Sequence, residues 1–222
     1  MTDSVGSIAI LGGTGDLGGG LARRWSRAGY RILIGSRTLA KGEAAAQALL
    51  DEFPDLNVTG YKNLDAATQA DLIVLTVPFE HQLSTLETVR PGLTGKILVD
   101  VTVPLMPPKV GTVQLPATGS AGQQAQDFLG EEVQVVSAFQ NVGAMHLRED
   151  HAIACDVLIC GNKRTARDTV ITLVEAVGLK GWHAGSIANA AAAEALTSVL
   201  IMINRHHGVE GSGIVITGEP TK

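Results

Sequence analysis

The feature that most constrains the fold is a glycine-rich segment, residues 12–18, which lies between a predicted strand and a predicted helix. Ser7–Leu11 is a short apolar run typical of a buried strand, and residues 17–28 have a helical pattern. A second apolar run, residues 31–35, completes a strand–helix–strand unit. Glycines in this context predict a turn that binds a dinucleotide, since a G-x-G-x-x-G pattern has this meaning between a strand and a helix.

The three glycines of that pattern are Gly13, Gly15 and Gly18. The first permits the tight turn, the second lets the backbone approach a pyrophosphate, and the third lets the helix pack closely on the strand. The free N–H groups and the positive dipole end of the helix then face the phosphates. The segment predicted to bind the cofactor is Gly13, Thr14, Gly15, Asp16, Leu17 and Gly18.

The end of the second strand indicates which dinucleotide binds. NAD sites usually carry an acidic residue there, which accepts hydrogen bonds from the ribose 2′-OH. This chain instead has Ser36 and Arg37, with Lys41 four residues further on. A guanidinium fork and an ammonium group attract a 2′-phosphate. The sequence therefore predicts NADP(H) as the cofactor.

Strand and helix patterns alternate along the chain, which predicts a doubly wound parallel sheet of the Rossmann type. We expect a dinucleotide-binding domain over residues 1–185 and a small C-terminal region over residues 186–222. The further strands are expected at residues 57–60, 71–77, 96–101, 133–138, 156–160 and 179–183, and the further helices at 64–70, 80–89, 123–129, 163–177 and 186–207. Residues 104–119, rich in Pro, Gly and Thr, are expected to form a long loop.

Ligands of such sheets bind beyond the carboxyl ends of the strands. This rule selects residues 12–18, 36–37, 76–81 and 102–105, and residues 136–142 end a later strand on the same side. His81 follows a strand end and is a candidate ligand contact, although it is also an ordinary residue for a helix start. Asp100 lies within an apolar strand, so it is either capped by backbone N–H groups or placed near the cleft.

The predicted last helix is apolar nearly all round and should be buried. A helix at this place in the chain finds cover most easily in a partner subunit, so we expect a homodimer. Residues 214–216 are a candidate edge strand.

The composition excludes some classes of protein. A net charge of −5 and a pI of about 5.6 give no basic field for nucleic acid, and no membrane span or signal peptide is expected. Cys155 and Cys160 should be separate core thiols on opposite faces of a strand, as in a cytoplasmic protein. We expect no metal site, and we assign no catalytic acid, base or nucleophile.

Several segments together resemble one family, the NADPH-dependent coenzyme F420 reductases. They are residues 12–18, 35–37 with Lys41, 76–81, 135–139, 156–161 and 184–186. The resemblance implies a Rossmann-type domain that aligns NADP(H) and the deazaflavin coenzyme F420, so that hydride passes directly between them. It also implies that such proteins are often dimeric.

The resemblance also implies roles for individual residues. Thr14, Ser36, Arg37 and Lys41 would hold NADP, and Val77, Pro78 and Phe79 would lie near the nicotinamide or along the adenosine side. The segment from Ala138 onward would face the deazaflavin. Gln140 and Asn141 stand where other members often carry a His, and their amides can donate to and accept from a ring edge.

Two alternatives to F420 reduction remain open from the residues alone. One is an NADP-dependent reductase of another acceptor, such as a flavin or a small carbonyl compound. The other is an NADP-binding redox sensor without turnover. The sequence does not indicate the direction of hydride transfer.

Overall fold

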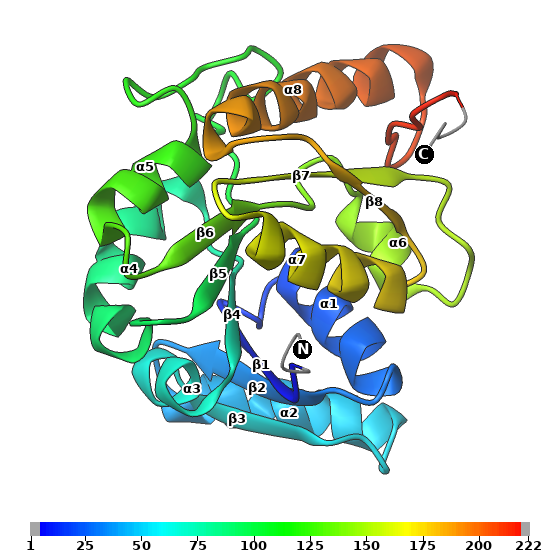
Figure 1. The fold of residues 1–222 in the computed structure, drawn as a ribbon. Coiled ribbons are helices and arrows are strands. Elements are labelled where there is room, and N and C mark those ends of the chain that lie inside the picture. The colour runs from blue at the N-terminus through cyan, green and yellow to red at the C-terminus, as the bar shows by residue number, and fades with distance from the viewer. Residues whose placement is uncertain (1–4, 219–222) are drawn as a thin grey trace.

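The computed structural model describes residues 5–218, and within them eight strands form one sheet with helices on both faces (Figure 1). The strands are β1 Ser7–Leu11, β2 Arg31–Ser36, β3 Val58–Lys62, β4 Leu72–Leu75, β5 Ile97–Asp100, β6 Gln134–Ser137, β7 Asp156–Gly161 and β8 Lys180–His183. The α-helices are α1 Asp16–Arg27, α2 Leu39–Glu52, α3 Asn63–Gln69, α4 Gln82–Val89, α5 Ala121–Leu129, α6 Ala144–Arg148, α7 Arg164–Ala176 and α8 Ala190–His207.

The strand order β3-β2-β1-β4-β5-β6-β7-β8 confirms a doubly wound α/β fold. The chain moves outward from β1 to β3 and then returns to β4 on the other side of β1. Strands β1 to β6 are all parallel, so their carboxyl ends meet at one edge of the sheet. The predicted ligand segments follow these ends.

The sheet is mostly parallel, as predicted, but β7 departs from the predicted pattern and runs antiparallel to β6 through two residue pairs, Val136 with Gly161 and Ser137 with Cys160. Strand β8 is parallel to β7, so both run against the rest of the sheet. The connection from β6 to β7 contains one α-helix, α6, which has five residues and packs against α1.

Three local predictions also differ from the structure. Residues 214–216 form no strand. The Ile216 N–H donates at 2.8 Å to the side-chain Oδ2 of Asp156, and not to a backbone carbonyl oxygen as it would in a sheet. Helices α2 and α6 were not predicted: α2 is rich in alanine with little contrast between its faces, and α6 is barely more than one turn.

Two apolar cores lie on opposite faces of the sheet. One packs the sheet against α1, α2, α6 and α7, and the other packs it against α3, α4 and α5. Cys155 belongs to the first core and Cys160 to the second, so the two thiols are separate and free, as expected. Burial raises the pKa of Cys160 to about 11, which keeps it protonated.

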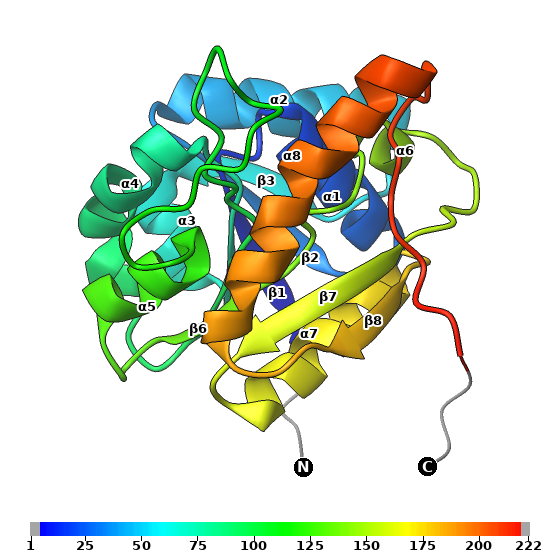
Figure 2. The ribbon, with the colours of Figure 1, turned by 90° about the horizontal axis from the view of Figure 1, so that it is seen from above.

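Helix α8 crosses one end of the molecule, with the long loop between β5 and α5 on one side and the segment after α8 on the other (Figure 2). The expectation that α8 is buried holds for one side. Ala190, Ala193 and Leu200 are buried, whereas Val199 is 44% and Ile203 is 39% exposed. By length and composition alone, the helical segment Ile187–His207 could span a membrane. A buried carboxyl in this segment, however, joins it to α5.

That carboxyl belongs to Glu194, which is 1% exposed. Its two oxygens accept from the N–H groups of Ala121 and Gly122, at 2.6 and 2.9 Å, at the start of α5. Burial raises the pKa of Glu194 from 4.5 to about 8, although both N–H groups oppose the shift.

The free energy of unfolding should therefore depend on Glu194. The unfolded chain releases this proton near pH 4.5 and the folded chain near pH 8. Stability should fall as pH rises between these values, with a slope of up to about 1.4 kcal/mol per pH unit. Glu194→Gln, which resembles the neutral acid, should flatten this slope.

Urea unfolding from pH 5 to 9 measures the effect, with Glu87→Gln on the exposed side of α4 as the control. Burial raises the pKa of Asp100 as well, so part of the slope should remain in Glu194→Gln. Equal slopes in the wild type and Glu194→Gln would contradict the prediction.

Candidate cofactor-binding site

The glycine loop turns directly from β1 into α1. Gly12 has a φ of +77°, a left-handed conformation that favours glycine, and its N–H donates to the Gly35 carbonyl oxygen at 3.1 Å. Gly13, to which the sequence pattern assigned the turn, has a negative φ; a Cβ there would lie 2.9 Å from the Ile10 carbonyl oxygen. The turn therefore needs both glycines, for different reasons.

The other two glycines have the predicted surroundings. A Cβ on Gly18 would lie 2.6 Å from Thr76 Oγ1 and 2.8 Å from the Gly13 Cα, so this residue sets the close contact of α1 with the strand ends. A Cβ on Gly15 would meet one protein atom within 4 Å, the Gly12 carbonyl oxygen at 3.6 Å. Gly15 thus has open space in front of it, at the N-terminus of α1.

That space is a cavity of about 280 Å³ at the carboxyl ends of β1, β2 and β4. It brings together residues predicted from three separate segments, together with others that were not predicted. Its lining comprises Gly12, Thr14, Gly15, Ser36, Arg37, Lys41, Asn63, Thr76, Val77, Pro78, His81, Ser84 and Thr85.

A second cavity of about 810 Å³ adjoins the first, since the two share Gly15, Thr76, Val77 and Pro78. Its remaining lining residues are mostly apolar and come from the start of α1, the segment after β4 and the loop after β5. They are Leu17, Phe79, Glu80, Val101, Thr102, Val103, Leu105, Met106, Pro107 and Val110.

The two cavities form one groove with a cationic end and an apolar end. Arg37 and Lys41 are exposed at the first cavity, and within residues 5–218 neither forms an ion pair. The N-terminus of α1 adds free N–H groups between the two ends. A dinucleotide with an anionic adenosine end and a neutral nicotinamide end fits this arrangement.

Six predicted site residues do not line the groove through either cavity. Gly13 and Gly18 shape the loop behind it, and the carboxylate of Asp16 pairs with Arg148 on α6. Ala138 is fully buried, and Gln140 is 5% exposed.

Asn141 is likewise absent from the cavity lining and is 3% exposed. Its side-chain amide donates to the Asp156 carbonyl oxygen at 2.7 Å, and that of Gln140 donates to the Asp100 carbonyl oxygen at 2.8 Å. The roles of Gln140 and Asn141 toward a deazaflavin stay predictions.

Several groove residues were missed, and for most of them the sequence carries a weak signal. Asn63, Ser84 and Thr85 lie on helices that begin beside the cleft, where polar residues are common in any protein. Residues 102–105 were expected at a strand end, but Met106, Pro107 and Val110 belong to a loop whose path depends on the whole fold.

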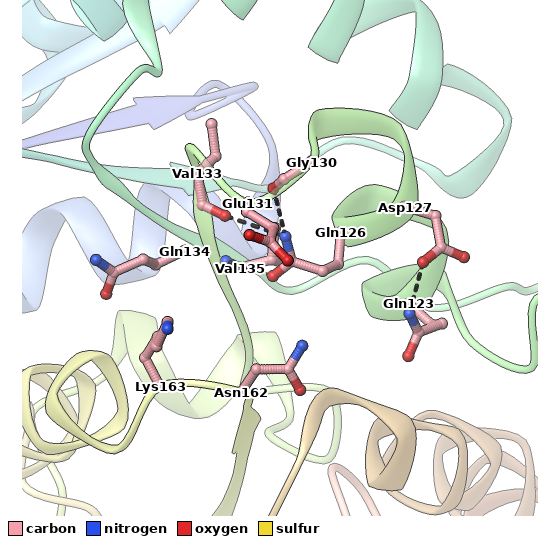
Figure 3. A pocket seen from close by; sticks show the side chains of 10 residues that line it. All are labelled: Gln123, Gln126, Asp127, Gly130, Glu131, Val133, Gln134, Val135, Asn162 and Lys163. Atoms are coloured by element: carbon pink, nitrogen blue, oxygen red, sulfur yellow. Dashed lines mark hydrogen bonds between the residues drawn. The ribbon is translucent and has the colours of Figure 1, made fainter.

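A further hollow of about 450 Å³ lies at the amino end of β6, the edge of the sheet away from the groove (Figure 3). Its amide side chains are largely paired with neighbours: Gln126 donates to the Gly130 carbonyl oxygen and Gln123 to Asp127, both at 2.7 Å. Within residues 5–218, no group of three or more His, Cys, Asp and Glu side chains could hold a metal ion.

The fold and the groove define a dinucleotide-binding protein of the Rossmann class. Comparison with known proteins narrows this class. Residues 7–104 match the family described as "NADP oxidoreductase coenzyme F420-dependent". The chain is 38% identical to F420-dependent NADP reductases of Methanocaldococcus jannaschii, over 95% of this chain and 97% of that protein, and of Methanothermobacter marburgensis, over 96% and 99%.

A solved structure described as an F420-dependent NADP-reductase, from Arthrobacter sp. FB24, superposes with a TM-score of 0.82 at 26% identity. The match covers 97% of this chain and 100% of that one. The chain belongs to the family of F420-dependent NADP reductases.

Gly15→Val should abolish dinucleotide binding and leave the fold intact. A Cβ at this position would meet no protein atom closer than the Gly12 carbonyl oxygen, so the fold has room for it, and the valine methyl groups would compete with a pyrophosphate for the space beside α1. Circular dichroism and an NADPH titration on the same sample measure the two effects. Gly6→Ala, at an exposed position before β1 and at the edge of the sheet away from the groove, serves as a control for the loss of a glycine. Retained NADPH affinity in Gly15→Val would show that the phosphates bind elsewhere.

Proposed function

We propose that this protein is an oxidoreductase that transfers hydride between NADP(H) and coenzyme F420. The observation that carries the proposal is the single groove in which a cationic end, the N-terminus of α1 and an apolar chamber follow one another. Near-full-length similarity to F420-dependent NADP reductases supports the same activity.

The residues of the first cavity would hold the NADP phosphates. The α1 N-terminus and the backbone at Gly15 would receive the pyrophosphate. Ser36, Arg37 and Lys41 would hold the 2′-phosphate, with Arg37 offering a planar fork and Lys41 a mobile charge. Asp16 adds negative charge nearby, and its ion pair with Arg148 offsets that charge.

The apolar chamber would enclose the reacting rings. When both cofactors are bound, the nicotinamide and the deazaflavin supply the redox chemistry between them. The protein contributes orientation and exclusion of water through walls such as Val77, Val101 and Val103. Direct hydride transfer needs no acid or base from the chain, in keeping with a chamber lined mostly by aliphatic groups.

NADP should bind far better than NAD. Removing a charge-assisted hydrogen bond costs roughly 1.5–3 kcal/mol, so Arg37→Ala should weaken NADPH binding about ten- to a hundredfold. NADH affinity should hardly change, because NADH lacks the 2′-phosphate. Titration of both cofactors against both proteins measures this, with Arg31→Ala as a control for loss of charge. An equal loss for NADPH and NADH would overturn the assignment.

Turnover separates F420 from other acceptors. With NADPH, the wild-type protein should show absorbance loss at 340 nm that depends on added F420. Flavin or a small carbonyl compound in place of F420 tests the alternative acceptors. Turnover with one of these and none with F420 would replace the proposed function.

We also propose that α8, within the small C-terminal region 186–222, forms a homodimer contact in a cytoplasmic protein. Val199 and Ile203 lie one turn apart on its exposed side, and Val209 and Val215 beyond its end are 44% and 60% exposed. Exposed apolar side chains of this kind favour contact with a second copy.

Light scattering at micromolar concentration should therefore give the mass of a dimer. Ile203→Glu should shift the mass toward that of a monomer, because it places a charge in the contact, whereas Glu87→Gln on α4 should not. A monomer mass for the wild type would contradict the proposal.

A further inference from the structure

Two histidines, His146 on α6 and His151 shortly after it, form the middle of a row of polar contacts. The ring nitrogens His146 Nδ1 and His151 Nε2 lie 3.2 Å apart. At the outer ends, His146 Nε2 lies 2.9 Å from the Gly211 carbonyl oxygen, and His151 Nδ1 lies 3.1 Å from Glu149 Oε2. The row therefore joins α6 to the segment that follows α8.

The outer contacts determine where the two rings carry their protons. A carbonyl oxygen and a carboxylate only accept hydrogen bonds, so both outer nitrogens must donate. A neutral imidazole has one N–H, and its other nitrogen then carries a lone pair. The inner nitrogens of the neutral pair therefore face each other with two lone pairs. A cation between them, either a proton or a metal ion, makes this contact favourable.

The separation of the inner nitrogens suits a metal ion. Imidazole nitrogens bind Zn²⁺ at about 2.0–2.1 Å, which places two nitrogens of a tetrahedral site about 3.3 Å apart. Histidines that bind metal almost always donate their second N–H to a carboxylate, a backbone carbonyl oxygen or water. His151 meets a carboxylate in this way, and His146 meets a carbonyl oxygen.

The surrounding chain holds both histidines in place. A Cβ on Gly143 would lie 3.1 Å from His146 Cδ2, and a Cβ on Gly211 would collide with the same ring. The Arg24 guanidinium of α1 donates to the backbone carbonyl oxygens of His146 and His151, at 2.9 and 3.1 Å. The two rings are thus positioned before any ion binds.

Solvent and charge also favour a cation here. The side chain of His151 is 41% exposed, so water has access to complete the coordination of an ion. Arg148 and Asp150 pair with side chains of α1. The carboxylate of Glu149, on the far side of His151, is left to offset the charge of the ion.

We propose that His146 and His151 bind one divalent transition-metal ion of the class that imidazole prefers, which includes Zn²⁺, Ni²⁺ and Cu²⁺, with water as the remaining ligands. The ion would join α6 to the segment after α8. Neither histidine lines the groove, so this inference does not rest on the proposed function. It departs from the sequence-based expectation of no metal site, because the facing of the two rings depends on Gly211, which is distant in the chain.

Calorimetric titration of the full-length protein with Zn²⁺ tests the proposal, on protein without a polyhistidine tag. The wild type should bind one Zn²⁺ ion, and His146→Gln and His151→Gln should each weaken this binding by at least about tenfold. His207→Gln, at the exposed end of α8, is the matched control and should bind Zn²⁺ like the wild type.

Two further measurements keep the test valid if a variant folds poorly. Zn²⁺ should raise the Tm of the wild type, because an ion that binds the folded chain stabilises it, and should not raise the Tm of either variant. In the wild type, ¹⁵N NMR of the imidazoles should show Zn²⁺ shifting His146 Nδ1 and His151 Nε2.

Three results would overturn the proposal. One is the absence of Zn²⁺ binding to the wild type, with both imidazole signals unchanged, since a proton alone would then lie between the rings. Another is a variant of either histidine that binds Zn²⁺ as tightly as the wild type. The third is a Zn²⁺-dependent shift confined to the His206 and His207 signals.

Discussion

The site depends on how closely the start of α1 approaches the ends of β1 and β4. At Gly18, an added Cβ would stand 2.6 Å from Thr76 Oγ1, and at Gly12 it would stand 2.8 Å from Val77 Cγ1. Side chains at these places would push α1 away from the sheet. The missing Cβ atoms therefore bring the N–H groups of α1 to the edge where β2, β4 and β5 also end. Both cavities of the groove depend on this contact.

Buried and half-buried polar groups hold the connections between helices and strands in place. The Arg24 guanidinium on α1 donates to backbone carbonyl oxygens of His146, Leu147 and Glu149. This joins α1 to the connection that reverses the sheet after β6. Glu194 ties α8 to α5 in a comparable way, and Asp100 ties the loop after β5 to α4. Such groups are costly to bury unpaired, so their pairing favours one path for each connection.

The two ends of the groove differ in their chemistry, since one carries positive charge and the other is mostly apolar. Arg37 and Lys41 are exposed at the first cavity, and under the proposed function their charges would attract the phosphate end of NADP(H). The neighbouring cavity of about 810 Å³ opens to solvent and has mostly apolar walls. Under the proposed function, the reacting rings would pack against these walls.

The sequence by itself determined the doubly wound fold, the glycine loop and the cationic strand end. These depend on local patterns: apolar runs, glycine spacing, and the absence of an acid after β2. The reversed β7, the missing strand at residues 214–216 and the burial of Gln140 were decided by tertiary structure. Each depends on contacts between residues distant in the chain, such as Asp156 with Ile216. Local patterns report which residues prefer to be strand, helix or turn; the pairing of buried polar atoms is settled when those elements pack together.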